Sequence, residues 1–488
     1  MPTAEKNPLF CTVDLGITYT SANYVKDGEF HYVTDEYGRT LIPSYISFVN
    51  DPNNNTATQI LVGQDAKVQL ETNPENTIFN WQRLFHLRYG DPIVQFEINH
   101  RRVPYKIVSS FHSPPHSTYT SLNHDGYPPL LPQGKEGNRH SLGFAMIQVT
   151  DTHNQKQLFR PEDLTALLVS KIKERAELQS GKAFNMAIVT VPTDYTDNQR
   201  WALEEAIRGT GLHPLRLMSR HHAPTFGYTR GRELEEEEEE LYMMVLVNLD
   251  PEYIEVAVVE LDEGVFELLG LVEQPARIPF DDKLAARPVI EFLIGQHLNR
   301  MAKNINGRLG ERAVAQHVMS RLNPGHKDDL PSILNDPIAM KRLQNELRKV
   351  NDVFTSMFPS PLRPPEPSQN FVRIEIENLF NGLDFSERLS FSQWQEFRQA
   401  TLKPILMETM EQALKKASID QSTVNMVVVA GASPFVPDAI RLLKHHFHFR
   451  KVDIPSLPDP ALATLEGASA IAATFGAVPD SGPCVDMG

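Results

Sequence analysis

The chain has 488 residues, a length that predicts two to four domains at about 100–200 residues each. Its 62 acidic and 47 basic residues give a net charge of −15, which repels phosphate groups, so we expect neither nucleic-acid nor membrane binding and favour basic partners. Two cysteines exclude a disulfide framework and a thiolate metal site, and the histidines lack ligand spacing, so no metal centre is expected.

The first 110 residues are predicted to be rich in strands. Apolar and polar residues alternate between turn signals at residues 10–13, 21–26, 30–34 and 45–49. Residues 109–139 crowd Pro, His, Ser, Asn and Gly together without periodicity, which predicts an inserted flexible loop. The first residues lack the basic and apolar regions of a secretory signal, which, with so few cysteines, favours the cytoplasm or the nucleus.

Strands and helices then alternate, as is typical of an α/β layer. Helices are predicted from Pro161 and over 198–209, with a buried strand at 186–192 between them. The acidic run 233–240 is interpreted as a solvated linker, with a patch for a basic partner as the alternative.

The second half repeats the same plan of hairpin strands followed by a strand and a helix. Three strands are predicted, then long helices, a Pro-rich break, a further strand from Phe371, a helix that a capping box at Ser392 starts, and a final strand and helix. The predicted segments are 242–249, 254–261, 265–271, 289–304, 336–357, 371–376, 392–417, 426–430 and 437–446.

The turn after the first strand has the features of a phosphate loop. Asp14 ends an apolar strand, and the small, hydroxyl-bearing residues up to Tyr19 let backbone N–H groups approach phosphate oxygens. The Asp14 carboxylate could hold hydrated Mg²⁺. Turns of this kind are more often purely structural, so the motif alone does not decide.

Six segments in the same order resemble the nucleotide-binding domain of the seventy-kilodalton heat-shock chaperones, within the actin-like ATPase superfamily. They are residues 13–19, 35–45, 73–84, 161–174, 187–200, and 428–437 with 466–468. The resemblance implies an α/β fold of two lobes, each with a five-stranded mixed sheet flanked by helices, that close over ATP and Mg²⁺ in the family.

The resemblance also implies how the chain is divided. We expect lobe I at 1–234 with the 109–139 insertion, lobe II at 241–440 with a helical subdomain, closing helices at 441–475 and a tail at 476–488. The family's peptide-binding domain would follow, and the 13 residues after Phe475 leave no room for it.

Some positions keep the family's residues for the nucleotide, and they are the candidate binding residues. They are Asp14, Gly16, Thr18 and Tyr19 in the first phosphate loop, and Gly431 and Ser433 in the adenosine strip.

Other positions depart from the family in ways that weaken phosphate chemistry. Ile17 stands where a Thr hydroxyl usually lies, Gln82 matches the catalytic Lys, and Arg220 reverses the charge of an acidic position. The Gly-rich second phosphate loop is replaced, and proline removes an N–H while two carboxylates repel phosphate. In the adenosine strip, Phe435 replaces the Arg that stacks on the base. The replacements in the second loop are Asn248, Asp250, Pro251 and Glu252.

These departures predict no catalytic residue, inefficient hydrolysis and no resident cofactor. The first hypothesis is a non-catalytic scaffold, co-chaperone or regulatory subunit that pairs with a J-domain cochaperone, a nucleotide-exchange factor or another chaperone-like subunit. The alternative is a divergent chaperone ATPase that binds ATP and Mg²⁺ through the retained residues and assists protein folding. The third hypothesis is a protein that uses the fold for an unrelated binding task, with the acidic run and the insertion as the surfaces that bind partners.

Overall fold

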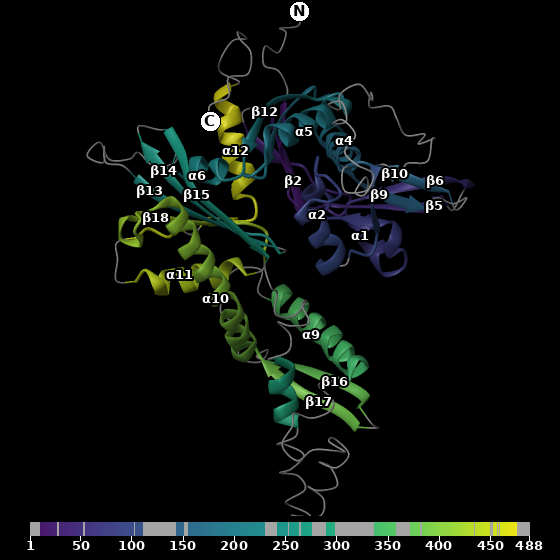
Figure 1. Cartoon of the computed structure of the whole chain (residues 1–488), viewed down its shortest axis with the longest axis vertical. Helices are drawn as coiled ribbons and strands as arrows, with labels where there is room; N and C mark the ends of the chain where they lie inside the picture. The colour runs from purple at the N-terminus through teal and green to yellow at the C-terminus, as the bar shows by residue number, and fades with distance from the viewer. Residues whose placement is uncertain are drawn as a thin grey trace, which may run out of the picture. The chain divides into compact units, whose positions relative to one another are not determined.

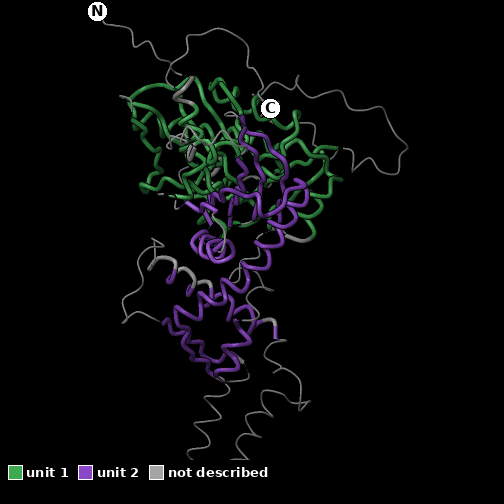
Figure 2. The backbone as a smooth tube through the Cα atoms, turned by 90° about the vertical axis from the view of Figure 1, so that its left-hand side faces the viewer, with its two compact units in different colours: residues 1–240, 459–488 green, residues 241–458 purple. Residues whose placement is uncertain are grey.

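The computed structural model divides the chain into two compact units, residues 1–240 with 459–488 (unit 1) and residues 241–458 (unit 2) (Figure 2). It describes residues 10–475 except 27–28, 52–53, 102, 111–142, 151–154, 230–241, 252, 263–264, 276–288, 298–335, 358–370, 381–382, 434, 449–451, 456 and 458. The predicted loop at 109–139 lies almost wholly, and the acidic run at 233–240 wholly, outside the described residues, so both stay predictions.

Unit 1 is built on a mixed sheet whose centre is the apolar first strand. Strand β1 (Phe10–Asp14) pairs in parallel with β11 (Met186–Val191) and antiparallel with β2 (Tyr19–Lys26). The order is β12-β11-β1-β2-β3, with β12 (His213–Ser219) and β3 (Glu29–Tyr32) at the ends, and β4 (Ile42–Pro43) pairs with the start of β2. Because β1 and β11 lie inside the sheet and are buried on both faces, they read as continuous apolar runs rather than alternating ones.

Helices α4 (Pro161–Ser180) and α5 (Asp197–Gly209) of unit 1 begin where the sequence predicts. Proline occupies the first turn of α4, and the side chain of Asp163 accepts the backbone N–H of Arg160. A capping box between Thr196 and Gln199 starts α5. Two more helices, α6 (His222–Thr229) and α12 (Ala463–Phe475), pack against each other, so the end of the chain returns to unit 1.

The rest of unit 1 is made of short elements beside this sheet (Figure 1). Two three-stranded antiparallel sheets have the orders β6-β5-β7 and β10-β9-β8. The elements are β5 (Tyr45–Asp51), β6 (Asn54–Val62), α1 (Gln64–Val68), β7 (Thr77–Phe79), the 3-10 turn η3 (Trp81–Leu84), α2 (Pro92–Phe96), β8 (Lys106–Ser109), β9 (Ala145–Thr150) and β10 (Lys156–Phe159).

Unit 2 repeats four of the strands of the unit 1 sheet in the same order. Its order is β15-β14-β13-β18, where β13 (Tyr242–Leu249) pairs antiparallel with β14 (Tyr253–Asp262) and in parallel with β18 (Met426–Ala430). Strand β15 (Val265–Pro275) completes the meander. In unit 1 the order β3-β2-β1-β11 corresponds to β15-β14-β13-β18 of unit 2. The repeat predicted from the sequence is therefore confirmed.

The predicted fifth strand of the second sheet is reduced to a single parallel bridge between Met426 and Asp453 in the described part of the chain. The backbone of Asp453 donates to the Asn425 carbonyl and accepts from the N–H of Val427, both at 2.9 Å. In a parallel ladder the next residue to donate would be Pro455, which has no N–H, so the pairing stops after one residue.

The remainder of unit 2 packs partly on this sheet, through α11 (Val436–His446) and the second half of α10 (Phe391–Ala417), and partly around a second core. Helix α10 starts at the cap Ser390, whose hydroxyl accepts the N–H of Gln393, and not at Ser392 as the sequence suggested. The strand before it runs up to Ser390, so the capping side chain belongs to the strand's last residue. The other elements are helical residues 289–297, α9 (Pro337–Met357), β16 (Phe371–Phe380) and β17 (Leu383–Ser390).

Candidate functional site

The first group of predicted site residues meets at the carboxyl ends of β1, β11 and β12. Parallel strands bring their carboxyl ends to one edge of a sheet, where ligands of such folds usually bind. Asp14 ends β1, and its carboxylate accepts a hydrogen bond from the hydroxyl of Thr190 on β11. The guanidinium Nε of Arg220, just after β12, lies 3.9 Å from the same carboxylate oxygen. Burial raises the pKa of Asp14 above its usual range, while the charge of Arg220 and the Thr190 hydroxyl oppose the shift.

The turn that follows Asp14 is tightly closed. The N–H of Gly16 donates to the Asp14 carbonyl at 3.1 Å, and a Cβ at Gly16 would lie 1.9 Å from the Tyr19 carbonyl oxygen. The Ser44 hydroxyl donates to the Gly16 carbonyl at 2.8 Å, and the Ser44 N–H donates to the Thr18 carbonyl at 2.9 Å. Only glycine fits at position 16, so the predicted strand-and-turn geometry is present.

The side chains of Ile17 and Tyr19 point to different surroundings. Ile17 is 4% exposed, so its apolar side chain is buried where the family carries a hydroxyl. The Tyr19 hydroxyl accepts a hydrogen bond from Lys67 Nζ at 3.3 Å, and this ammonium also lies over the rings of Tyr19 and Tyr45. Lys67 is a cation beside the turn that the sequence pattern did not single out.

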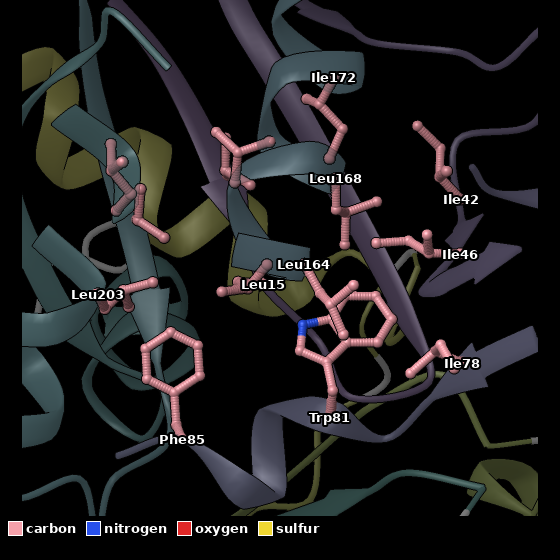
Figure 3. Packing of buried hydrophobic residues seen from close by; sticks show 14 of the residues in the cluster. Leu15, Ile42, Ile46, Ile78, Trp81, Phe85, Leu164, Leu168, Ile172 and Leu203 are labelled. Carbon is pink, nitrogen blue, oxygen red and sulfur yellow. The ribbon is translucent and has the colours of Figure 1, made fainter. Parts of the chain in front are cut away.

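Gln82 in η3 also contacts the turn. Its Nε2 donates to the Gly16 carbonyl at 3.1 Å, and its backbone carbonyl accepts a hydrogen bond from the Tyr195 hydroxyl at 2.8 Å. The side chain is 2% exposed, and among the described residues its Oε1 has no hydrogen-bond donor. The neighbours Leu15 and Trp81 belong to the hydrophobic core of unit 1, so the core anchors both sides of this contact (Figure 3).

Arg220 is the second cation beside the turn that follows Asp14. Its Nη2 donates to the Leu15 carbonyl at 2.8 Å and its backbone N–H to the Val191 carbonyl at 2.9 Å. The side chain is 4% exposed. One guanidinium therefore meets both the carboxylate of Asp14 and the backbone of the turn, which is the arrangement that a buried charge needs.

Next to Arg220, the side chain of His221 is buried in the interior of unit 1. Its Nδ1 lies 3.1 Å from the Thr193 hydroxyl, and burial lowers the pKa of the imidazole to about 3. Among the described residues there is no group of three or more His, Cys, Asp or Glu placed to hold a metal ion.

A buried acid lies near Gln82 that the sequence did not flag. Glu162, in the first turn of α4, accepts the backbone N–H of His86 at 3.1 Å, and His86 Nδ1 lies 3.9 Å from the same oxygen. His86 has a φ of 52°, in the left-handed region. Burial raises the pKa of Glu162 from its ordinary 4.5 to about 7, with the nearby charges of Arg160 and Asp163 opposing each other.

The raised pKa of Glu162 predicts a pH dependence of stability. Between about pH 4.5 and 7 the folded chain keeps a proton that the unfolded chain loses, so the free energy of unfolding falls as pH rises, by up to about 3 kcal/mol. Glu162→Gln keeps the acceptor for His86 and cannot ionise. We expect the variant to match the wild type at pH 5 and to exceed its stability at pH 8, measured by urea unfolding. If the free energy of unfolding changed equally with pH in the two proteins, the raised pKa assigned to Glu162 would be contradicted.

The second group of predicted site residues lies in unit 2, at the ends of β13 and β18. The Asp250 N–H donates to the Tyr253 carbonyl at 3.0 Å and closes the hairpin turn. Gly431 has a φ of 115°, and a Cβ there would lie 2.1 Å from the Leu249 carbonyl oxygen. The Ser433 N–H donates to the same carbonyl at 3.0 Å. The two loops are thus packed backbone to backbone, with Asn248 and Asp250 buried; Glu252 lies outside the described residues.

Phe435, at the end of the adenosine strip, is turned into the protein. Its side chain is 5% exposed, and the guanidinium carbon of Arg398 lies 4.2 Å from the ring centroid. A ring that is covered in this way offers no free face to a planar ligand. Arg398 comes from α10 and was not among the predicted site residues.

Comparison with known families decides the membership of the chain. The family model described as Hsp70 protein matches residues 11–125, 139–273 and 298–479. The chain belongs to the Hsp70 family. The match covers both units, so the predicted actin-like ATPase fold is confirmed, and chaperone function and ATP binding are the activities of the family.

Within each unit the structure brings several of the predicted site residues together. In unit 1 they are Asp14, Gly16, Gln82 and Arg220, and in unit 2 they are Asn248, Asp250, Gly431 and Ser433. Sequence reasoning missed Thr190, Tyr195, Lys67 and Arg398, although the first two lie in or beside a segment that carries the resemblance. In the described part of the chain, no helix is long and apolar enough to span a bilayer.

Proposed function

We propose that this chain is a non-catalytic Hsp70-family protein that works as a scaffold, co-chaperone or regulatory subunit. The observation that carries the proposal is the pairing of Arg220 with Asp14 at the first phosphate turn. In a phosphate site the Asp14 carboxylate would face a hydrated metal cation. Here a guanidinium of the chain itself faces that carboxylate, and it is held by a hydrogen bond to Leu15.

The other contacts at the two loops support the same proposal. At position 82 an amide donates to the Gly16 carbonyl, and it cannot neutralise the charge that develops on a transferred phosphoryl group. In the second loop the Asp250 carboxylate would repel phosphate, and Pro251 has no N–H to offer it. The residues present are therefore a poor fit for Mg-ATP, and we derive no catalytic step through it.

One observation favours the alternative, a divergent ATP-binding chaperone ATPase. The turn at Gly16 and the left-handed Gly431 keep the close backbone approach that a phosphate-binding loop needs. Backbone N–H groups alone can hold an anion weakly, even where the charged side chains are lost.

Thermal unfolding of the full chain with and without millimolar Mg-ATP separates the two functions. A ligand at a thousand times its Kd adds about 4 kcal/mol to the free energy of unfolding and raises the midpoint by several degrees. We expect no shift with Mg-ATP, Mg-ADP or Mg²⁺ alone. A clear shift with Mg-ATP that Asp14→Asn removes would favour the alternative, and phosphate release above a protein-free control would make it an ATPase.

For the partner we propose a J-domain cochaperone, a nucleotide-exchange factor or another chaperone-like subunit. The support is family membership together with a net charge of −15, which favours a basic partner surface. Co-purification of the full chain followed by mass spectrometry tests this. Recovery of the chain alone as a monomer would count against a stable complex.

A further inference from the structure

The described residues of unit 2 form two separate hydrophobic cores that share one helix. The first core lies between the sheet, the second half of α10 and α11, and the second lies between α9, β16, β17 and the start of α10. Helix α10 contributes Trp394 to the second core and residues from Leu402 onward to the first. It contacts β14 and β15 as well as β17 (Figure 1).

The part of α10 between the two cores is a weak point of the helix. Pro404 lies inside the helix, where it has no N–H for the carbonyl of Ala400 and its ring crowds that carbonyl. The Thr401 hydroxyl donates back to the Phe397 carbonyl at 3.0 Å, a contact that also tends to bend helices. Bending at this place would move the second core relative to the sheet without disturbing the packing inside either core.

Arg398 lies at this junction and contacts both cores. Its guanidinium carbon is 4.2 Å from the ring centroid of Trp394, in the second core, and 4.2 Å from that of Phe435, in the first. Its Nε and Nη2 both lie 2.8 Å from Asp438 Oδ2 on α11. The other oxygen of Asp438 accepts from Arg441. Arg398 and Asp438 are 2% and 3% exposed.

We propose that Arg398 is a clamp that holds the two cores of unit 2 in one arrangement across the flexible point of α10. A flat, always charged guanidinium can stack on one ring from each core and still bind a carboxylate in its plane, which no other side chain can do. The clamp is internal to unit 2 and concerns its conformation, so it goes beyond the proposed loss of nucleotide chemistry and does not depend on it.

Hydrogen–deuterium exchange on the full chain tests the clamp. In Arg398→Met, which keeps an unbranched apolar stem without the charge and the flat face, we expect the backbone amides of residues 398–406, Pro404 excepted, to exchange at least tenfold faster. Amides of β13, β14 and β18 should exchange at the wild-type rate. The matched control is Arg388→Met, because Arg388 on β17 stacks on the single, half-exposed ring of Phe371. This control is expected to leave residues 398–406 unchanged.

Two results would overturn the proposal. One is wild-type exchange of residues 398–406 in Arg398→Met. The other is equal acceleration in β13, β14 and β18, which would mean general destabilisation of unit 2 rather than release at one point. If Arg398→Met does not accumulate as folded protein, Arg398→Lys carries the test, since it keeps the charge and loses the flat face. Faster exchange at 398–406 in that variant supports the clamp, and wild-type exchange there overturns it.

Discussion

Replacing Arg220 by methionine is expected to lower the free energy of unfolding of unit 1 by about 3–5 kcal/mol. The change leaves the largely buried Asp14 carboxylate, 14% exposed, without its cation and the Leu15 carbonyl without its donor. Urea unfolding followed by tryptophan fluorescence measures the loss, because two of the three tryptophans, Trp81 and Trp201, lie in unit 1. The control is Arg208→Met, which removes an exposed pair with Glu204 and Glu205 and should cost less than about 1 kcal/mol.

A double-mutant cycle distinguishes a direct pair from two independent effects. Asp14→Asn removes the charge that Arg220 compensates, so the double variant Asp14→Asn with Arg220→Met should cost at least about 1 kcal/mol less than the sum of the single changes. Additive costs, or a loss below about 1 kcal/mol for Arg220→Met alone, would show that the two groups do not stabilise each other. The proposed reason for a lost metal site would then fail.

The second large effect is expected at Gly467, where α12 crosses α6. A Cβ at this position would lie 1.7 Å from the Ala223 carbonyl oxygen and 2.3 Å from its carbon, so the obstacle is backbone that cannot rotate away. Gly467→Ala should therefore cost about 3 kcal/mol or more, although alanine is the better helix former. Thermal unfolding of the purified variant measures the cost.

Gly295 offers the matched control for this change. It lies in a helical segment of unit 2, and a Cβ there meets no described atom within 4 Å. Gly295→Ala is expected to be neutral or to stabilise the chain by about 0.5–1 kcal/mol, because alanine loses less backbone freedom on folding. A small effect of Gly467→Ala, similar to that at Gly295, would mean that α12 can move off α6 at little cost.

Much of the fold could be predicted because its signals are local. The apolar runs of β1, β11, β13 and β18, and the capping box of α5, lie within a few neighbouring residues. The cap of α10 was misplaced by two residues because Ser390 and Ser392 both fit the pattern, and only the end of β17 distinguishes them. The loss of the fifth strand of the second sheet could not be predicted. It depends on Pro455 falling at a position that must donate a hydrogen bond, and that position is known only from the pairing register of the strands.

The sequence by itself determined the order of elements, the repeat of one plan in two halves and the family, because these depend on periodicity and on motifs in sequence order. It also marked Gln82, Arg220 and Phe435 as departures from the family. What these side chains do was decided only by the tertiary structure. Arg220 meets Asp14, and Phe435 is covered by Arg398, across long stretches of chain that no local pattern connects. Ion pairs and stacked rings act over a few ångströms, so their partners are known only once the strands and helices have been packed.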